Sequence, residues 1–294
     1  MSSIAIVGKG AWGTALGESL RVAGHDVAYR GRGEASTALR SAELILMAVP
    51  AQATRGVLSE IVDAVPPDAF LVVTAKGLET GSMLRQSQLV AEALPDAQIA
   101  VLSGPGFAAD LHRGLPTAIT LATQSSAAQE LQEMLATPSL RPYLSDDMIG
   151  AELGGALKNV IAIAAGIAIG AGLGESARAA LIARGFAEMR RIATAAGARE
   201  ETLAGLSGLG DLTLTATSEQ SRNFVYGKTL GQTGAPPRGD GTYEGASSAL
   251  AALALAARLQ VQAPIIDTVS ALVTGTLEVP DAIDRLYGRP LTRE

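Results

Sequence analysis

Cysteine is absent from this 294-residue chain, and histidine occurs only twice. The absence of cysteine excludes disulfides, thiolate metal sites and cysteine nucleophiles. His25 falls in a turn before an expected strand, and nothing in the sequence around His112 suggests a partner. We therefore expect no metal site, and we expect lysine rather than histidine to serve as any general acid or base.

An excess of positive charge is also lacking, because the formal net charge is −6. A chain of this kind has no electrostatic footprint for nucleic acid. Anionic small ligands are not excluded, since a pocket can be basic inside an acidic protein. Hydrophobic residues make up 48% and charged residues 18%, which is typical of a folded globular protein.

Long hydrophobic runs are missing. The longest apolar stretch, Val160 to Gly174, has 15 residues, fewer than the roughly 20 that span a bilayer. Its Gly and Ala content predicts a buried core helix. The chain passes from Met1-Ser2-Ser3 directly into "IAIVG" without a visible targeting segment. We expect no membrane span and a cytoplasmic location.

Short apolar runs and helical patterns alternate in the first half. The expected strands cover residues 4–8, 26–30, 43–49, 70–75, 98–103 and 117–123. Apolar strands joined by helices predict a parallel sheet that is covered on both faces. From about Met148 the patterns are helical, rich in Ala and Leu, and contain no convincing strand. The expected domains are an α/β dinucleotide-binding domain at 1–147 and an all-helical substrate-binding domain at 148–294.

The stretch "IAIVGKGAWGTALGESL" contains Gly8-x-Gly10-x-x-Gly13 between a strand and a helix. In such a fingerprint the first glycine permits a tight turn, the second admits a diphosphate, and the third allows close helix–strand packing. The pattern alone is weak, and a turn without a ligand would look the same. Its place at the start of an α/β chain favours a Rossmann-type, doubly wound domain. Ala11 and Trp12 lie inside the loop, and Trp12 either packs beside the cofactor or fills space.

The end of the second strand bears on the choice of cofactor. It reads Tyr29-Arg30-Gly31-Arg32, and two arginines suit the 2′-phosphate of NADP. We predict that NADPH is preferred over NADH. Glu34 lies close by, and arginines are common at strand ends, so NAD stays open as the alternative.

The first half of the dinucleotide domain is shortened. Only residues 31–42 separate Arg30 from Glu43, and this length barely allows a crossover between parallel strands. We predict at most two helical turns in this segment. The outer strand of the first mononucleotide half should be absent.

Lysines occur at two informative places. Lys76 ends a strand, where parallel sheets bind ligands. Lys158 enters the apolar helix "GGALKNVIAIAAGIAIGAG", where a lone lysine could simply extend its charge to water. Gly154 and Gly155 precede Lys158 by one turn, and each glycine costs about 1 kcal/mol relative to alanine in a helix. This cost indicates that a ligand or another backbone approaches the helix there.

Five stretches carry a resemblance to a known family. They are "LSGPGFAADL" (102–111), "ELGGALKNVIAIAAGIAIGAGLG" (152–174), "ARAALIARGFAEM" (177–189), "GLSGLGDLTLTATSEQSRNFVYGKTLG" (205–231) and "EGASSA" (244–249). Over nearly its whole length the chain resembles bacterial NAD(P)-dependent glycerol-3-phosphate dehydrogenases. The resemblance implies reversible reduction of dihydroxyacetone phosphate to sn-glycerol 3-phosphate by NADPH or NADH. The product would feed phospholipid synthesis.

The resemblance assigns a catalytic group. Lys158 matches the lysine that donates a proton to the C2 oxygen in reduction, and Asp211 matches a carboxylate near that lysine. Lys76 matches a lysine that contacts both substrate and cofactor. Two neighbouring ammonium groups lower each other's pKa, which helps an amine transfer protons near neutral pH.

The remaining matches imply binding contacts. Substrate contacts are expected from Lys76, Gly104, Gly106, Thr215, Ser221, Arg222 and Asn223. With the fingerprint and strand-end residues included, cofactor contacts are expected from Gly8, Gly10, Ala11, Trp12, Gly13, Arg30, Arg32, Lys76, Ala108, Arg222 and Glu244. An arginine and polar donors at a helix start, as at 221–223, suit a phosphate monoester.

The chain departs from the family pattern in three places, and the shortened segment 31–42 is the first of them. Gly106 stands where a small hydroxyl residue is usual, so one substrate hydrogen bond is missing or comes from the backbone. Lys9 lies inside the fingerprint, where it could touch a cofactor phosphate or face solvent.

Two other functions remain open. Another β-hydroxyacid or ketopantoate-type reductase would share the dinucleotide domain and the active lysine but has no need of a phosphate site. A dinucleotide-sensing module would have no need of a proton donor. A homodimer is a further possibility, because the Ala-rich helices could cover an interface or belong to the core.

Overall fold

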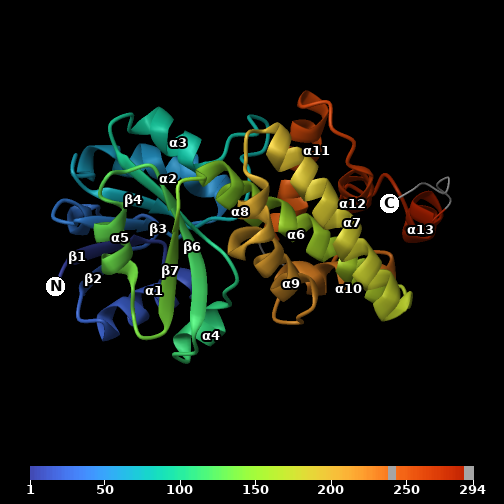
Figure 1. The fold of residues 1–294 in the computed structure, drawn as a ribbon, viewed down its shortest axis with the longest axis horizontal. Helices are drawn as coiled ribbons and strands as arrows, with labels where there is room; N and C mark the ends of the chain where they lie inside the picture. The colour runs from blue at the N-terminus through green and yellow to red at the C-terminus, as the bar shows by residue number, and fades with distance from the viewer. Residues whose placement is uncertain (238–242, 288–294) are drawn as a thin grey trace.

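A sheet of seven strands forms one half of the molecule in the computed structural model, which describes residues 1–237 and 243–287 (Figure 1). The strand order is β2-β1-β3-β4-β5-β6-β7. The strands are β1 (Ser3–Val7), β2 (Asp26–Arg30), β3 (Leu44–Met47), β4 (Phe70–Val73), β5 (Gln98–Ser103), β6 (Thr117–Thr123) and β7 (Leu140–Ser145). All six expected strands are confirmed.

The expected parallel sheet is confirmed except at β6. Strand β6 runs antiparallel to β5, with Ser103 opposite Thr120, whereas every other adjacent pair is parallel. The segment between β5 and β6, which contains α4, does not cross back to the opposite end of the sheet. The chain therefore enters β6 from the end at which it left β5.

Strand β7 was missed by the sequence analysis. Its segment "LRPYLS" contains Arg141 and Pro142 and lacks a continuous apolar run. Proline is tolerated there because β7 is an edge strand, and its outer side needs no N–H donor for a neighbour. Leu140 and Pro142 are buried while Arg141 and Tyr143 are exposed, which is the alternation of a half-covered strand.

The shortened first half is confirmed. Residues 31–42, all of which the structure describes, contain a single 3₁₀ turn at Thr37–Leu39 and no strand. Strand β2 is therefore the edge of the sheet. The chain passes from β2 on one side of β1 to β3 on the other, which makes the carboxyl ends of β1 and β3 the switch point where such folds bind ligands.

Helices cover both faces of the sheet, which confirms the doubly wound architecture. Along β1, Ile4 and Ile6 belong to one apolar cluster, whereas Ala5 and Val7 belong to another on the opposite face. The first face is covered by α1 (Ala11–Val22), α4 (Ala108–His112) and α5 (Ala128–Leu135). The second face is covered by α2 (Thr54–Ile61) and α3 (Gln86–Ala93).

The second half is helical. No strand occurs in its described residues, 146–237 and 243–287. Its helices are α6 (Met148–Gly170), α7 (Gly174–Ala195), α8 (Glu200–Ala204), α9 (Asp211–Ala216), α10 (Arg222–Thr233), α11 (Glu244–Arg258), α12 (Pro264–Val273) and α13 (Val279–Tyr287). The expected domain 148–294 also includes 238–242 and 288–294, which lie outside the described residues. Figure 1 shows these helices grouped beside the sheet.

Helix α6 forms the centre of the helical half. It is the one helix in the described ranges that is long and apolar enough to cross a membrane, yet 89% of its apolar window is buried inside the protein. Burial all round explains why it is apolar all round. The prediction of a buried core helix is confirmed.

Glycines bring α6 and α10 unusually close. A Cβ at Gly227 would lie 2.0 Å from the Ile163 carbonyl oxygen, and one at Gly166 would lie 2.1 Å from the Phe224 carbonyl oxygen. Only hydrogen fits in either place. This contact sets the position of the amino-terminal end of α10 relative to the side chains of α6.

Candidate active site

A cavity of about 560 Å³ lies where the sheet meets the helical half. One wall consists of the loops after β1, β3, β4 and β5, at the carboxyl ends of these strands. The other wall comes from α6, α9, α10 and α11. The lining includes Gly10, Ala11, Trp12, Lys76, Gly106, Ala108, Lys158, Asp211, Thr215, Ser221, Arg222, Asn223 and Glu244. Most of the predicted site residues therefore share one cavity.

The fingerprint loop has the geometry that a dinucleotide needs. A Cβ at Gly8 would lie 2.3 Å from the Ala48 carbonyl oxygen, and φ there is +111°, so only glycine suits this turn. A Cβ at Gly13 would lie 2.4 Å from the Gly8 carbonyl oxygen. A Cβ at Gly10, by contrast, would meet no described atom within 4 Å. Gly8 thus permits the turn, Gly13 permits close packing, and Gly10 leaves room for a ligand.

The amino-terminal end of α1 faces this open space. Its cap residue is Gly10, and among the described residues no side chain caps the helix. The first amides of a helix lack partners within the helix and favour an anion. The residues present therefore fit the diphosphate of NAD or NADP.

Two lysines share one carboxylate at the centre of the cavity. Lys158 Nζ lies 3.0 Å from Asp211 Oδ1, and Lys76 Nζ lies 2.6 Å from Asp211 Oδ2. Lys158 also donates to Thr215 Oγ1 at 2.6 Å. Lys76 donates to the Gly104 carbonyl at 2.8 Å. The predicted catalytic group is thus assembled from three segments, and Lys76 ties it to a fourth at the end of β5.

Close backbone packing makes this cluster possible. A Cβ at Gly154 would lie 2.5 Å from the Ser207 carbonyl oxygen, in a π-helical turn (Leu206–Gly210) that leads directly into Asp211. A Cβ at Gly155 would lie 2.6 Å from Ser103 Oγ. The two glycines before Lys158 therefore accommodate protein atoms from both neighbouring segments. Single π-turns inside helices are frequent at functional sites.

Burial and charge alter the acidity of the cluster. Burial is the largest influence on Lys158; Lys76 acts in the same direction, Asp211 opposes both, and the pKa of Lys158 falls to about 8. Burial opposes ionisation of Asp211, but Lys158 and Lys76 outweigh it and hold the pKa of this carboxyl below its ordinary value. The expected influence of Lys76 on the pKa of Lys158 is present but secondary to burial.

The start of α10 forms a second polar group in the cavity. Ser221 caps the helix and its Oγ accepts from the Phe224 amide at 3.2 Å. Arg222 is exposed at the first helical position. Asn223 is buried, and its Oδ1 accepts from the Gly245 amide at 3.0 Å. The expected helix start at 221–223 is confirmed, and its amides and guanidinium could bind a phosphate together.

Glu244 connects the two halves. It begins α11, lines the cavity and accepts a hydrogen bond from the Ala51 amide, which lies in the loop after β3. Burial raises the pKa of Glu244 above its ordinary value, although Arg222, Lys158 and Lys76 act in the opposite direction.

Trp12 explains the glycine at position 106. A Cβ on Gly106 would lie 3.2 Å from Trp12 Cη2 and 3.1 Å from Thr117 Cγ2. A hydroxyl side chain there would press on the tryptophan ring. Any contact of Gly106 with a substrate must therefore come from its backbone.

Arg30 and Arg32 are not brought into the cavity. Arg30 is only 5% exposed and donates to Glu60 Oε2 at 2.6 Å and to Ser36 Oγ at 3.1 Å. The buried guanidinium is held by Glu60 of α2 and by Ser36 in the segment after β2, so this placement does not support its predicted contact with a 2′-phosphate. Arg32 is exposed near the end of β2 and does not line the cavity.

Neither histidine belongs to the site. His112 Nδ1 lies 2.5 Å from Glu18 Oε2 on the surface, and His25 Nδ1 accepts from the Ser2 amide. Among the described residues, no group of three or more His, Cys, Asp or Glu could hold a metal ion. The cavity has Lys76, Lys158 and Arg222 against Asp211 and Glu244, and this local positive excess suits an anionic ligand.

Several lining residues were missed by sequence reasoning. Asn159 lines the cavity and donates to the Lys76 carbonyl at 3.1 Å, which joins α6 to the loop after β4. Val49 and Pro50 follow β3 at the switch point. Small apolar side chains carry no chemical signature, but the rule that ligands lie at the carboxyl ends of strands would have found this loop.

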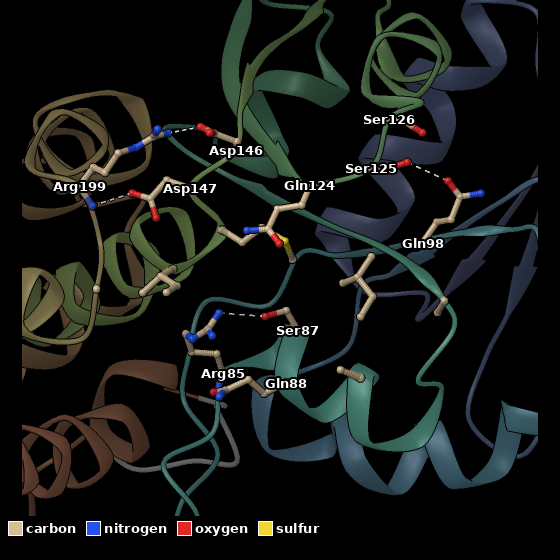
Figure 2. A pocket seen from close by; sticks show the side chains of 16 residues that line it. Arg85, Ser87, Gln88, Gln98, Gln124, Ser125, Ser126, Asp146, Asp147 and Arg199 are labelled. Carbon is tan, nitrogen blue, oxygen red and sulfur yellow. Dashed lines mark hydrogen bonds and ion pairs between the residues drawn. The ribbon is translucent and has the colours of Figure 1, made fainter.

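A second cavity, of about 740 Å³, lies apart from these residues (Figure 2). Figure 2 shows that its charged side chains already face partners, with Arg199 directed at Asp146 and Arg85 directed at Ser87. Asp147 accepts from the Gly150 and Arg199 amides. None of the predicted site residues lines it, so the cavity with the lysine cluster is the candidate active site.

Known proteins resemble this chain along almost its full length. Residues 30–129 match the family model described as the NAD-dependent glycerol-3-phosphate dehydrogenase N-terminus, and residues 147–284 match the model of its C-terminus. A protein of Paracoccus denitrificans named glycerol-3-phosphate dehydrogenase [NAD(P)+] is 50% identical over 99% of this chain and 100% of its own length. A protein of the same name from Cereibacter sphaeroides is 56% identical over 85% of this chain and 82% of its own.

A solved structure agrees with these relatives. The crystal structure of glycerol-3-phosphate dehydrogenase from Coxiella burnetii has a TM-score of 0.91 and 32% identity, and the match covers 98% of this chain and 99% of that chain. The alignment with the Paracoccus protein extends over 315 residues, so that relative contains residues that this 294-residue chain lacks.

Proposed function

The chain belongs to the NAD-dependent glycerol-3-phosphate dehydrogenase family, and we propose that it reversibly reduces dihydroxyacetone phosphate to sn-glycerol 3-phosphate with NADH or NADPH. One observation supports this above the others. Lys158, Asp211 and Lys76 share a cavity with the start of α10, and Gly10 of the fingerprint lines the same cavity. A proton donor, a phosphate site and a cofactor site thus face one space.

Lys158 is proposed as the proton donor to the C2 oxygen. An ammonium group has three N–H donors. Two of them are directed to Thr215 Oγ1 and Asp211 Oδ1, at 2.6 and 3.0 Å, and the third remains for the substrate oxygen. With a pKa of about 8, the amine can give a proton in reduction and take one back in oxidation near neutral pH. When bound, the nicotinamide supplies or accepts the hydride.

Asp211 and Lys76 position this donor. Because Asp211 accepts from both lysines, its carboxylate fixes the distance between the two ammonium groups and keeps both charged groups compensated in a buried place. Lys76 is tied to Gly104 at the end of β5. Its remaining N–H can hold a substrate oxygen against the donor. Loss of Asp211 would leave the buried Lys158 and the partly buried Lys76 without the carboxylate that both contact.

Arg222, Ser221 and Asn223 are proposed to hold the phosphate. A phosphate carries the charge that the first amides of α10 and the Arg222 guanidinium favour. The remote phosphate would align the carbonyl for hydride transfer. Ala11, Trp12, Ala108 and Glu244 line the cofactor side of the cavity, and the second fingerprint glycine leaves room for the diphosphate.

A preference for NADPH stays a prediction. Since Arg30 is buried against Glu60, the exposed Arg32 and Lys9 are the cations that support it. The test is to measure kcat/KM with NADPH and with NADH. Equal values would contradict the predicted preference for NADPH.

One assay separates the candidate functions. Oxidation of NADPH or NADH is followed with dihydroxyacetone phosphate, with ketopantoate and without an acceptor. We expect turnover with dihydroxyacetone phosphate alone. Turnover with ketopantoate would favour the other reductase, whereas cofactor binding without any turnover would favour a sensing module.

Wider context is proposed on the same basis. The protein would act in the cytoplasm, and its product would supply phospholipid synthesis. A domain division at 147 is supported by Asp147, which accepts from the Gly150 amide and so caps α6 after the last strand. A homodimer stays a hypothesis that sedimentation velocity would test.

A further inference from the structure

An exposed ion pair lies beside the end of β2, next to the fingerprint loop. Lys9 Nζ lies 2.5 Å from Glu34 Oε1, and the Gly31 amide donates to Glu34 Oε2 at 2.9 Å. The two side chains are 49% and 46% exposed. Neither residue takes part in the catalytic cluster.

The pair lies where the adenosine end of a dinucleotide is expected. Lys9 stands between Gly8 and Gly10 of the fingerprint, and the Gly8 amide donates to the Arg30 carbonyl at 2.9 Å, which ties this loop to the end of β2. In doubly wound domains, an acidic residue near this strand end binds the ribose hydroxyls of NAD, or an arginine accommodates the 2′-phosphate of NADP. In this chain the Arg30 side chain is directed to Glu60. Lys9 and Glu34 are therefore the charged residues that occupy this position at the strand end.

The shortened segment brings Glu34 back to the strand end. Without an outer strand, residues 31–34 form a tight turn in which the Glu34 amide also donates to the Gly31 carbonyl at 3.3 Å. The hydrogen bonds from Lys9 and from the Gly31 amide hold the pKa of Glu34 below its ordinary value. At neutral pH the place therefore holds a carboxylate and an ammonium group in contact.

Such a pair can serve either cofactor. An exposed ion pair contributes little to stability, so a ligand can replace either partner. A carboxylate accepts from ribose hydroxyls but repels a phosphate, while an ammonium group binds the phosphate. We propose that the Lys9–Glu34 pair sets cofactor choice: Glu34 accepts from the adenosine ribose hydroxyls of NAD(H), and Lys9 binds the 2′-phosphate of NADP(H). The inference rests on the proposed function only in assuming a dinucleotide at the fingerprint.

The test measures binding rather than turnover. Dissociation constants of the full chain are determined by titration calorimetry for adenosine 5′-monophosphate and adenosine 2′,5′-bisphosphate, which differ only in the 2′-phosphate. Energy transfer from Trp12, the single tryptophan, which lines the cavity, reports binding of NADH and NADPH. The variants are Glu34→Gln and Lys9→Met. Lys228→Met is the control, because it removes the same charge from another exposed pair, with Glu219.

Opposite shifts are expected. Glu34→Gln should tighten the bisphosphate and NADPH about tenfold and weaken the monophosphate and NADH severalfold, the scale of one charged hydrogen bond. Lys9→Met should weaken the bisphosphate and NADPH at least about tenfold. The same variant should leave the monophosphate and NADH within about twofold. Lys228→Met should change none of the four.

Three results would overturn the proposal. If affinity for all four ligands falls equally, the pair only stabilises the loop. If the affinity ratio between ligands with and without the 2′-phosphate is unchanged, the pair does not select the cofactor. The same shift in Lys228→Met would assign the effect to net charge. If the unmodified chain binds neither NADH nor NADPH, the proposed function fails as well, whereas binding of both with unchanged ratios overturns this inference alone.

Discussion

The catalytic end and the adenosine end of the crevice are built by opposite means. At the catalytic end, Lys158 and Asp211 are 5% and 1% exposed, and each contacts more than one polar partner. At the adenosine end, Lys9 and Glu34 are about half exposed and contact each other directly at 2.5 Å. Burial forces a charge to be compensated and shifts its pKa, whereas exposure leaves a charge free to exchange partners.

The difference separates chemistry from selection. A proton donor must keep its geometry throughout the reaction, so it lies on α6 one turn after Gly154 and Gly155, which pack against the Ser207 backbone and the Ser103 side chain. A selecting pair must release one partner when a ligand arrives, so it lies on loops. We expect substitutions at the catalytic end to lower kcat strongly, and substitutions at the adenosine end to change cofactor affinity by smaller factors.

The largest effect should come from the buried lysine. Lys158→Ala is expected to lower kcat by about 10²-fold or more, the scale of a lost acid or base, because the donor acts in the transition state. Steady-state kinetics with dihydroxyacetone phosphate measure it. Lys228→Met, in the surface pair with Glu219, is the matched lysine control, and its kcat should stay within about twofold. Near-normal kcat in Lys158→Ala would show that this lysine only extends its charge to water.

Arg222→Ala should act mainly through binding. The loss of one charged phosphate contact should raise KM for dihydroxyacetone phosphate by about 10- to 100-fold, with a smaller loss of kcat from poorer alignment. Dihydroxyacetone, which has no phosphate, provides the sharper measurement. The unmodified chain and the variant should reduce it equally slowly. Equal impairment with both substrates would remove Arg222 from the phosphate site.

Close helix packing at the catalytic end should be sensitive to one methyl group. Gly227→Ala is expected to lower the free energy of unfolding by about 1–3 kcal/mol, because the new Cβ would overlap the Ile163 backbone. Gly56→Ala in α2 is the control, since its Cβ would meet no described atom within 4 Å. It should stabilise by up to about 1 kcal/mol, as alanine is the better helix former. Denaturant unfolding measures both, and equal changes would contradict the packing argument.

The smallest effect should be the pH dependence of kcat/KM, which reports ionisation of the buried Lys158 in the unmodified chain. Lys158 is protonated below its pKa of about 8. Reduction needs the protonated form, so kcat/KM should fall about tenfold per pH unit above that pKa. Oxidation needs the neutral amine and should rise up to the same pH. Parallel profiles in both directions would assign the transition to another group.

Local pattern predicted more of the fold than of the site geometry. The six apolar strands and the glycine fingerprint depend on neighbours within a few residues, and all were found where expected. Strand β7 escaped because its pattern is broken by Arg141 and Pro142, which only an edge position permits. The reversal at β6 escaped because direction depends on which end of the sheet receives the chain.

The sequence by itself determined the architecture, the shortened segment 31–42 and the residue types of the catalytic group, because these follow from periodicity, chain length and motif. Only the tertiary structure decided which charges meet. Arg30 pairs with Glu60, Lys9 pairs with Glu34, and Asp211 receives two lysines from segments 53 and 135 residues away. Such partners are chosen by packing over long sequence separations. Burial at the meeting point, which no residue carries alone, then sets the pKa of Lys158.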